Sequence, residues 1–103
     1  MTRIVIVPLT MIRTFACRET ERLFHDEPSR RLPPGIQQAA RRKLLLIDQS
    51  HGLTDLRSPP GNRLEPLKGS RQGQHSIRVN QQWRICFRWQ DGDAFNVEIV
   101  DYH

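Results

Sequence analysis

The chain has 103 residues and carries 16 lysines and arginines against 11 acids, a formal net charge of +5 at pH 7. This length fits one domain with a modest core, which buries about 60–65% of the surface that the unfolded chain exposes. The basic balance favours anionic partners, and two cysteines are too few for a disulfide framework, which fits a reducing cytoplasm.

The first ten residues contain only a short apolar run, Ile4–Val7. This is far below the roughly 20 residues that span a bilayer, so no membrane segment is expected. Met11 is interpreted as the start of the domain, directly before the first expected strand. Residues 1–10 are therefore expected to be a poorly ordered extension from an early start codon, and residues 11–103 to form one domain.

The N-terminal half reads as strand, helix, breaker and helix. A strand is expected at Met11–Phe15, a short helix at Thr20–Phe24, and a proline-bounded loop at Pro28–Pro34. The main helix is expected at Gly35–Gln49, where apolar residues recur at helical spacing. These residues are Ile36, Ala39, Ala40, Leu44 and Ile47.

The C-terminal half alternates short strand patterns with polar turns that contain glycine, asparagine or aspartate. Strands are expected at Arg63–Leu67, Gln74–Val79, Trp83–Trp89 and Phe95–Tyr102. The short turns between them predict an antiparallel meander. The fold class is therefore α+β, with two N-terminal helices packed on one face of an antiparallel sheet.

Strand periodicity predicts which side chains face the helices. Trp83, Ile85, Phe87 and Trp89 should contact them, so Arg84 should project to the opposite, open face, where its loss would affect activity more than stability. The tight turn before this strand brings Arg78 beside Arg84, with Lys68 and the C-terminal tail nearby. His75 shares its parity with Ile77 and is expected to be a partly buried structural histidine.

The segment Arg57–Trp89 holds seven basic residues and one acid, Glu65, and overlaps the predicted sheet. The rest of the chain carries four acids, Asp101 among them, and no further lysine or arginine, and it ends on Asp101, Tyr102 and His103. Like charges on neighbouring strands repel unless an anion lies between them. The expected anion is RNA.

Each candidate also has an ordinary explanation. Lys68 in a turn is commonly solvated, Arg84 can pair with Glu65, Glu98 or Asp101, and a terminal His103 is commonly frayed. Cleavage of RNA by its 2′-hydroxyl nevertheless needs these residue types together. It requires a group that removes the 2′ proton, cations that stabilise the phosphorane, and an acid that protonates the leaving 5′ oxygen.

Four motifs carry a resemblance to a known family. They are Leu64–Gly69, His75–Asn80, Trp83–Phe87 and Val100–His103. In this order they resemble the HigB-type killer proteins, a branch of the RelE/ParE toxins, over about residues 11–103. The resemblance implies a bacterial type II toxin that cuts mRNA on the ribosome without a metal or cofactor. Its implied partner is a HigA-type helix-turn-helix antitoxin, and operator DNA would be bound only through the toxin–antitoxin complex.

By motif, Lys68, Arg84, Asp101 and His103 fall where this family places catalytic or phosphate-binding residues. Arg71, Arg78, Arg88 and Tyr102 are the further candidates for RNA binding. Many members of the branch carry a histidine at the position of Glu65. A carboxylate between Lys68 and Arg84 is a weaker proton acceptor near pH 7. Either Glu65 serves as the base and activity is mild, or His103 serves as the base.

Two other function classes remain open from the sequence. One is a ParE-like gyrase inhibitor on the same fold, and the other is a nucleic-acid-binding module without chemistry. Lys68 and the terminal His103 favour the nuclease, because a protein that only binds has no need of an imidazole there.

Overall fold

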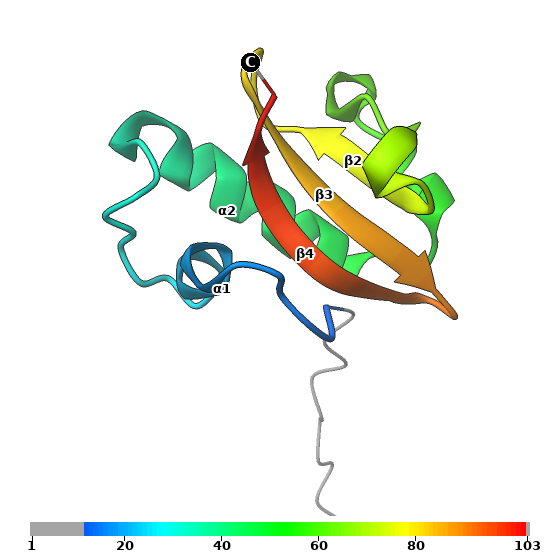
Figure 1. Ribbon diagram of the computed structural model, residues 1–103, viewed down its shortest axis with the longest axis horizontal. Coiled ribbons are helices and arrows are strands. Elements are labelled where there is room, and N and C mark those ends of the chain that lie inside the picture. The colour runs from blue at the N-terminus through cyan, green and yellow to red at the C-terminus, as the bar shows by residue number, and fades with distance from the viewer. Residues whose placement is uncertain (1–11, 103) are drawn as a thin grey trace, which may run out of the picture.

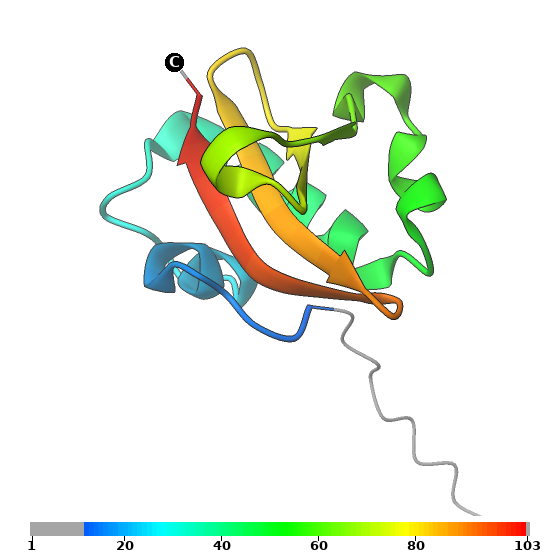
Figure 2. The ribbon, with the colours of Figure 1, turned by 45° about the vertical axis from the view of Figure 1, so that its right-hand side comes forward.

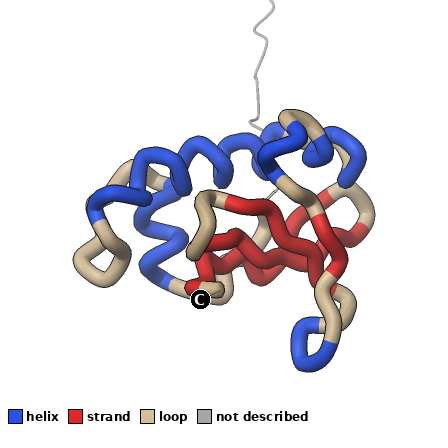
Figure 3. The backbone as a smooth tube through the Cα atoms, turned by 90° about the horizontal axis from the view of Figure 1, so that it is seen from above, coloured by secondary structure: helices blue, strands red, loops and turns tan. Residues whose placement is uncertain are grey.

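The computed structural model describes residues 12–102. The expected extension at residues 1–10, Met11 and His103 lie outside the described residues. Two helices lie along one side of a four-stranded antiparallel sheet (Figures 1 and 3). The elements are α1 (Arg18–Phe24), α2 (Pro34–Gln49), β1 (Glu65–Pro66), β2 (Gln74–Arg78), β3 (Trp83–Gln90) and β4 (Asp93–Asp101). The strands are neighbours in sequence order, so the predicted α+β meander is confirmed.

Helix α2 supplies most of the helical contribution to the core. It begins one residue before the predicted start, with Pro34 in its first turn, a position that tolerates the missing N–H. Ile36, Ala40, Leu44 and Ile47 form its buried stripe, which faces β3 and β4. Burial of one such aliphatic side chain contributes about 1.5–3 kcal/mol, so this stripe fixes the helix on the sheet.

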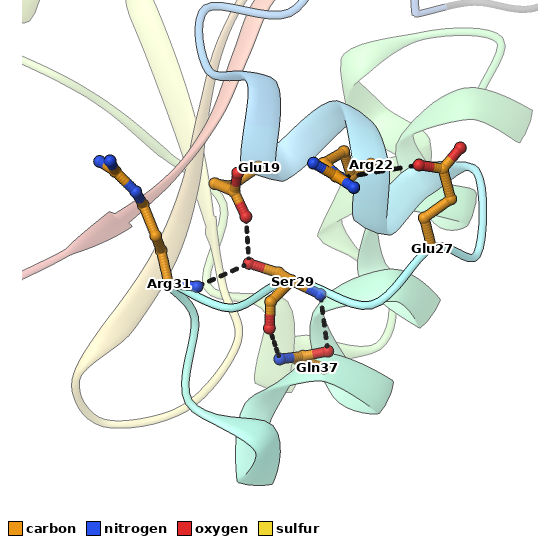
Figure 4. Close-up of polar contacts among 6 residues, drawn as sticks. All are labelled: Glu19, Arg22, Glu27, Ser29, Arg31 and Gln37. Carbon is orange, nitrogen blue, oxygen red and sulfur yellow. Dashed lines mark hydrogen bonds and ion pairs between the residues drawn. The ribbon is translucent and has the colours of Figure 1, made fainter.

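The connection between α1 and α2 is ordered by one buried serine (Figure 4). The Ser29 hydroxyl donates to a Glu19 carboxylate oxygen at 2.7 Å and accepts from the backbone N–H groups of Arg31 and Leu32. The Gln37 amide nitrogen donates to the carbonyls of Ser29 and Leu32 at 2.9 and 2.8 Å. These bonds satisfy backbone groups that the loop would otherwise bury unpaired.

The residues of β3 separate onto two faces as predicted. Ile85 and Phe87 are fully buried beneath the helices, and Trp83 and Trp89 pack against the same core at its margins. Strand β4 contains a bulge: its register with β3 shifts by one residue between Cys86 and Arg88. Asn96 lies at this bulge with a φ of 55°, and the extra residue lets Ala94 and Val97 both face the core.

The predicted strand at Met11–Phe15 is wrong over its described residues. Ile12 and Phe15 form only isolated parallel bridges to β4, opposite Ala94 and Val97. A regular ladder is interrupted there by the bulge, where the Asn96 backbone N–H donates to the Thr14 hydroxyl at 2.8 Å. Segment 12–16 thus follows the edge of β4 without becoming a strand of the sheet.

The connection from α2 to β1 is shaped by a buried asparagine. It contains two short 3₁₀ helices, η1 (Leu53–Arg57) and η2 (Pro60–Asn62). Asn62 donates to the carbonyls of Leu56 and Ser58 and accepts from the Lys43 amine. Burial lowers the pKa of Lys43, and the nearby Arg42 adds to this shift. Because the next residue, Arg63, has a φ of 46°, the predicted strand at Arg63–Leu67 is shortened to β1.

Candidate functional site

The open face of the sheet, opposite the helices, carries one polar row that crosses all four strands. The strand register places Glu65 opposite Ser76, Ser76 opposite Cys86, and Cys86 opposite Glu98. A single 3₁₀ turn, η3 (Gly69–Arg71), lies over this face between β1 and β2 (Figure 2). The central residues Ser76 and Cys86 are fully buried, so this face is covered at its middle.

Arg84 lies next to this row and is 8% exposed. Its Nε donates to the Ser76 hydroxyl at 2.7 Å, and its Nη2 donates to the Arg63 carbonyl. The same Nη2 lies 3.1 Å from a Glu65 carboxylate oxygen. Arg84 is on the predicted face, but its side chain is not open as expected, because three partners surround the buried guanidinium.

The ion pair between Arg84 and Glu65 is the ordinary pairing that the sequence left open. This ion pair leaves part of the hydrogen-bonding capacity of the guanidinium unused, since Nη1 makes no hydrogen bond within residues 12–102. Glu65 is 54% exposed on its side chain and therefore remains open to solvent and to a ligand. The result is a fixed cation with one donor group still available beside an exposed carboxylate.

The C-terminal tail is bound to the turn between β2 and β3, and it approaches this cluster through Tyr102. The Tyr102 backbone N–H donates to the Gln82 carbonyl at 2.7 Å, and the Gln82 amide donates to Asp101 at 3.1 Å. The Arg84 guanidinium carbon lies 5.9 Å from the Tyr102 ring centre, within the range of a cation–π contact. Burial raises the pKa of the Tyr102 hydroxyl, and the neighbouring Cys86 thiol raises it further.

Arg71 reaches across the covered middle of the open face. Its Nη2 lies 3.2 Å from a Glu98 carboxylate oxygen, and its Nη1 donates to the Gln74 side-chain oxygen at 3.1 Å. Glu98 therefore pairs with Arg71. The pairing of Glu98 with Arg84, which the sequence had left open, does not occur. Beneath them, burial raises the pKa of the Cys86 thiol, so it stays protonated near neutral pH.

The other three cations occupy the rim of the face. Lys68 is exposed at the start of η3, and Arg78 lies directly opposite Arg84 in the strand register, as predicted. Arg88 is exposed on the same face but four residues further along β3, about 13 Å from Arg84. Within residues 12–102 none of the three makes an ion pair.

The structure thus brings together Glu65, Arg84 and Tyr102, with Arg78 beside them. Asp101 lies opposite Trp83 in the strand register, so its side chain belongs to the other face of the sheet, at the end of β4. Lys68 and Arg71 approach from η3, Arg88 lies apart, and His103 is outside the described residues. Sequence reasoning missed Ser76 as the anchor of Arg84, and it missed the partner of Arg71. The hairpin register contained the signal for Ser76, since pairing Arg78 with Arg84 places Ser76 opposite Cys86.

His75 takes the structural role that was predicted. It is half-buried on the helix side of β2, and its ring stacks on Phe87 with centroids 6.4 Å apart. Its Nδ1 is buried and has no hydrogen-bond partner among residues 12–102. The same part of the chain contains no group of three acidic, histidine or cysteine side chains that could hold a metal ion. No helix within residues 12–102 is long and apolar enough to cross a membrane.

Two solved structures share this architecture. One is a mutant of YafQ from E. coli, with a TM-score of 0.60 and 14% identity over 87% of this chain and 90% of that one. The other is the YoeB–YefM complex from Staphylococcus aureus, with a TM-score of 0.56 and 20% identity over 89% of this chain and 94% of the other. YafQ and YoeB are RelE-fold toxins, so the fold is that of this class.

Comparisons of sequence define the family more closely. The family model described as the RelE-like toxin of the type II toxin–antitoxin system HigB matches residues 13–103. Toxin HigB-1 of Vibrio cholerae is 44% identical over 84% of this chain and 92% of its own length. Endoribonuclease HigB of Proteus vulgaris is 32% identical over 90% of this chain and all of its own. The chain belongs to the HigB-like family of type II toxins.

Proposed function

We propose that this toxin is an endoribonuclease that cleaves mRNA held on the ribosome, with the open face of the sheet as its active site. The family consists of RelE-like toxins, and the Proteus vulgaris relative is named an endoribonuclease. The observation that supports the proposal is the buried Arg84, which three partners hold and whose Nη1 makes no hydrogen bond within residues 12–102. A fixed guanidinium of this kind stabilises charge that develops on a phosphate.

In the proposed reaction, the 2′-oxygen attacks the adjacent phosphorus and the bond to the 5′ oxygen breaks. The products are a 2′,3′-cyclic phosphate and a 5′-hydroxyl. The leaving 5′ oxygen takes its proton from His103 when Glu65 is the base, and from water when His103 is the base. Arg84 and Lys68 stabilise the negative charge of the phosphorane. The base is either His103 or Glu65, whose carboxylate forms the ion pair with Arg84.

The remaining candidate residues are given roles according to their positions in the fold. Asp101 holds the end of β4 through Gln82, and Tyr102 presents a ring on which a nucleobase can stack. Arg78 and Arg88 attract the RNA backbone from the rim. With so few groups of its own, the site relies on the ribosome to hold the RNA in line, an effect worth about 7–11 kcal/mol of the barrier.

Mapping of mRNA 5′ ends after brief induction tests the proposal. Cleavage within translated regions is expected, and unchanged transcripts with failed supercoiling would instead indicate the gyrase inhibitor. Arg84→Ala should lower cleavage about 100- to 1,000-fold, and removal of His103 about 100- to 10,000-fold. Lys68→Ala should weaken both RNA binding and cleavage. Full toxicity without His103 would overturn the catalytic assignment.

Glu65→Gln separates the two candidate bases. If Glu65 removes the 2′ proton, cleavage collapses to the level seen without His103. If Glu65 only pairs with Arg84, cleavage persists or rises, because the change leaves more of the guanidinium charge for the phosphate. Single-turnover cleavage on programmed ribosomes measures the difference.

Membership of a toxin–antitoxin family implies an antitoxin partner. We propose a HigA-type helix-turn-helix protein, encoded beside the toxin, that stabilises the toxin fold by binding only its native state. Operator DNA is then bound only by the complex, and both proteins act in the cytoplasm. A gel-shift experiment tests this: the complex should retard operator DNA, and the toxin alone should not.

The functional unit is proposed to be residues 11–103, with residues 1–10 as a dispensable extension. A chain that starts at Met11 should fold and remain toxic. Loss of toxicity with intact expression and folding would show that the first ten residues have a role.

A further inference from the structure

The turn between β1 and β2 carries Lys68 at its start and Arg71 at its end. The Arg71 backbone N–H donates to the Lys68 carbonyl at 3.3 Å, so the two residues belong to one short turn. Gly69 and Gly73 adopt φ values of 65° and 93°, a conformation that disfavours side chains and lets the chain fold back over the sheet. This turn lies over the open face of the sheet (Figure 2).

Side-chain contacts show what holds the turn down. From the end of η3, Arg71 bonds Gln74 on β2 and Glu98 on β4. It therefore spans the open face from β2 to β4, above Cys86. Both members of the ion pair are 31% exposed on their side chains, so the contact is more protected than the ion pairs among exposed groups elsewhere.

The partners of Arg71 argue against a direct role in RNA binding. Glu98 neutralises its charge, whereas Lys68, Arg78 and Arg88 make no ion pair within the described residues. If Arg71 turned to a phosphate, it would leave the Glu98 carboxylate half-buried and facing the RNA backbone. The free cations on the rim have no such cost.

We propose that Arg71 is a positioning residue that, through Glu98 and Gln74, clamps the turn of residues 68–73 so that Lys68 is held toward the phosphate beside Arg84. The inference rests on the proposed nuclease function and reassigns Arg71 from the expected set of RNA ligands. A small displacement of a charge-stabilising group costs up to about 100-fold in rate, so the clamp should act on turnover and much less on RNA affinity.

Glu98→Gln distinguishes the two roles by sign. The clamp predicts that kcat on programmed ribosomes falls about 10- to 100-fold with little change in KM, although the protein becomes more cationic. An RNA-binding Arg71 predicts equal or tighter binding and unchanged or faster cleavage. Glu27→Gln is the matched control, because it makes the same chemical change in the exposed ion pair with Arg22, on the helix side of the molecule.

Two further variants test whether the clamp acts through Lys68. The reversed pair Arg71→Glu with Glu98→Arg should recover most of the turnover lost in either single variant. In a Lys68→Ala background, Glu98→Gln should cause almost no further loss. A reversed pair as inactive as its parents, or fully additive losses with Lys68→Ala, would overturn the proposal.

Amide hydrogen exchange supplies a readout that does not depend on RNA cleavage. Residues 68–73 should exchange several-fold faster in Glu98→Gln than in the native chain, with β3 unchanged. Equal protection of the turn in both proteins would refute the clamp even if the nuclease function stands. Faster exchange in a chain that cleaves no mRNA would keep the clamp and refute the nuclease.

Discussion

Adjacent residues of β3 are buried on opposite faces of the sheet, yet in different surroundings. Ile85 and Phe87 are enclosed by the apolar side chains of the helices, whereas Arg84 and Cys86 are enclosed by Ser76, a tyrosine ring and charged groups. Apolar burial stabilises a fold without directional bonds, but a buried cation contributes little net stability unless each partner stays in place. The open face is therefore built for a defined geometry, and the helix-covered face for stability.

The largest effect is expected on the helix-covered face. Phe87→Ala should lower the free energy of unfolding by about 3–5 kcal/mol, because the ring is fully buried against the helix layer. Urea unfolding measures it, and Phe87→Leu is the milder variant if the alanine chain does not fold. Cys86→Ala, one position away on the other face, should lower the free energy of unfolding much less. An equal loss in the two variants would contradict the difference between the two faces.

Arg84→Ala should be the most destabilising change among the cations of the open face. It leaves the Ser76 hydroxyl and the Arg63 carbonyl without their donor, and a cost of about 2–3 kcal/mol is expected from urea unfolding. Arg88→Ala, an exposed residue on the same strand, should stay within about 0.5 kcal/mol. Comparable losses in the two variants would mean that Arg84 is not anchored as described.

Thiol reactivity should report how well the tail covers the open face. In a Cys17→Ser background, alkylation at pH 8 should be slow, because burial raises the pKa of Cys86 and excludes the reagent. Tyr102→Ala removes the side chain beside the thiol and should speed the reaction several-fold by letting the reagent reach it. An unchanged rate would show that Tyr102 does not protect the thiol.

The smallest expected effect is a pH dependence from the helix side. The hydrogen bond from Ser29 lowers the pKa of Glu19, so its stabilisation is present above the unfolded-state value and is lost as the pH falls through the folded-state value. Thermal unfolding below pH 5 should therefore vary less with pH in Glu19→Gln. The exposed Glu21→Gln on the same helix is the control, and identical slopes in all three proteins would contradict this.

The periodicity of apolar residues was sufficient to predict the structural features that depend on apolar burial. The alternation around Ile85 and the helical spacing of Leu44 predicted the sheet faces and α2, because both depend on which side chains leave water. Met11–Phe15 was misread since its pairing depends on a bulge at Asn96, which no local pattern marks. The burial of Arg84 was missed because a cation is expected to stay exposed, and its anchors lie on other strands.

The bulge in β4 also bears on how copies of the toxin meet. An uncovered strand edge offers a row of free N–H and C=O groups to which another chain can add. Segment 12–16 uses those groups of β4, with Arg13 and Ala16 donating to Ala94 and Val97. The opposite edge, β1, is two residues long and contains a proline. Released from its antitoxin, the toxin thus presents little template for edge-to-edge aggregation.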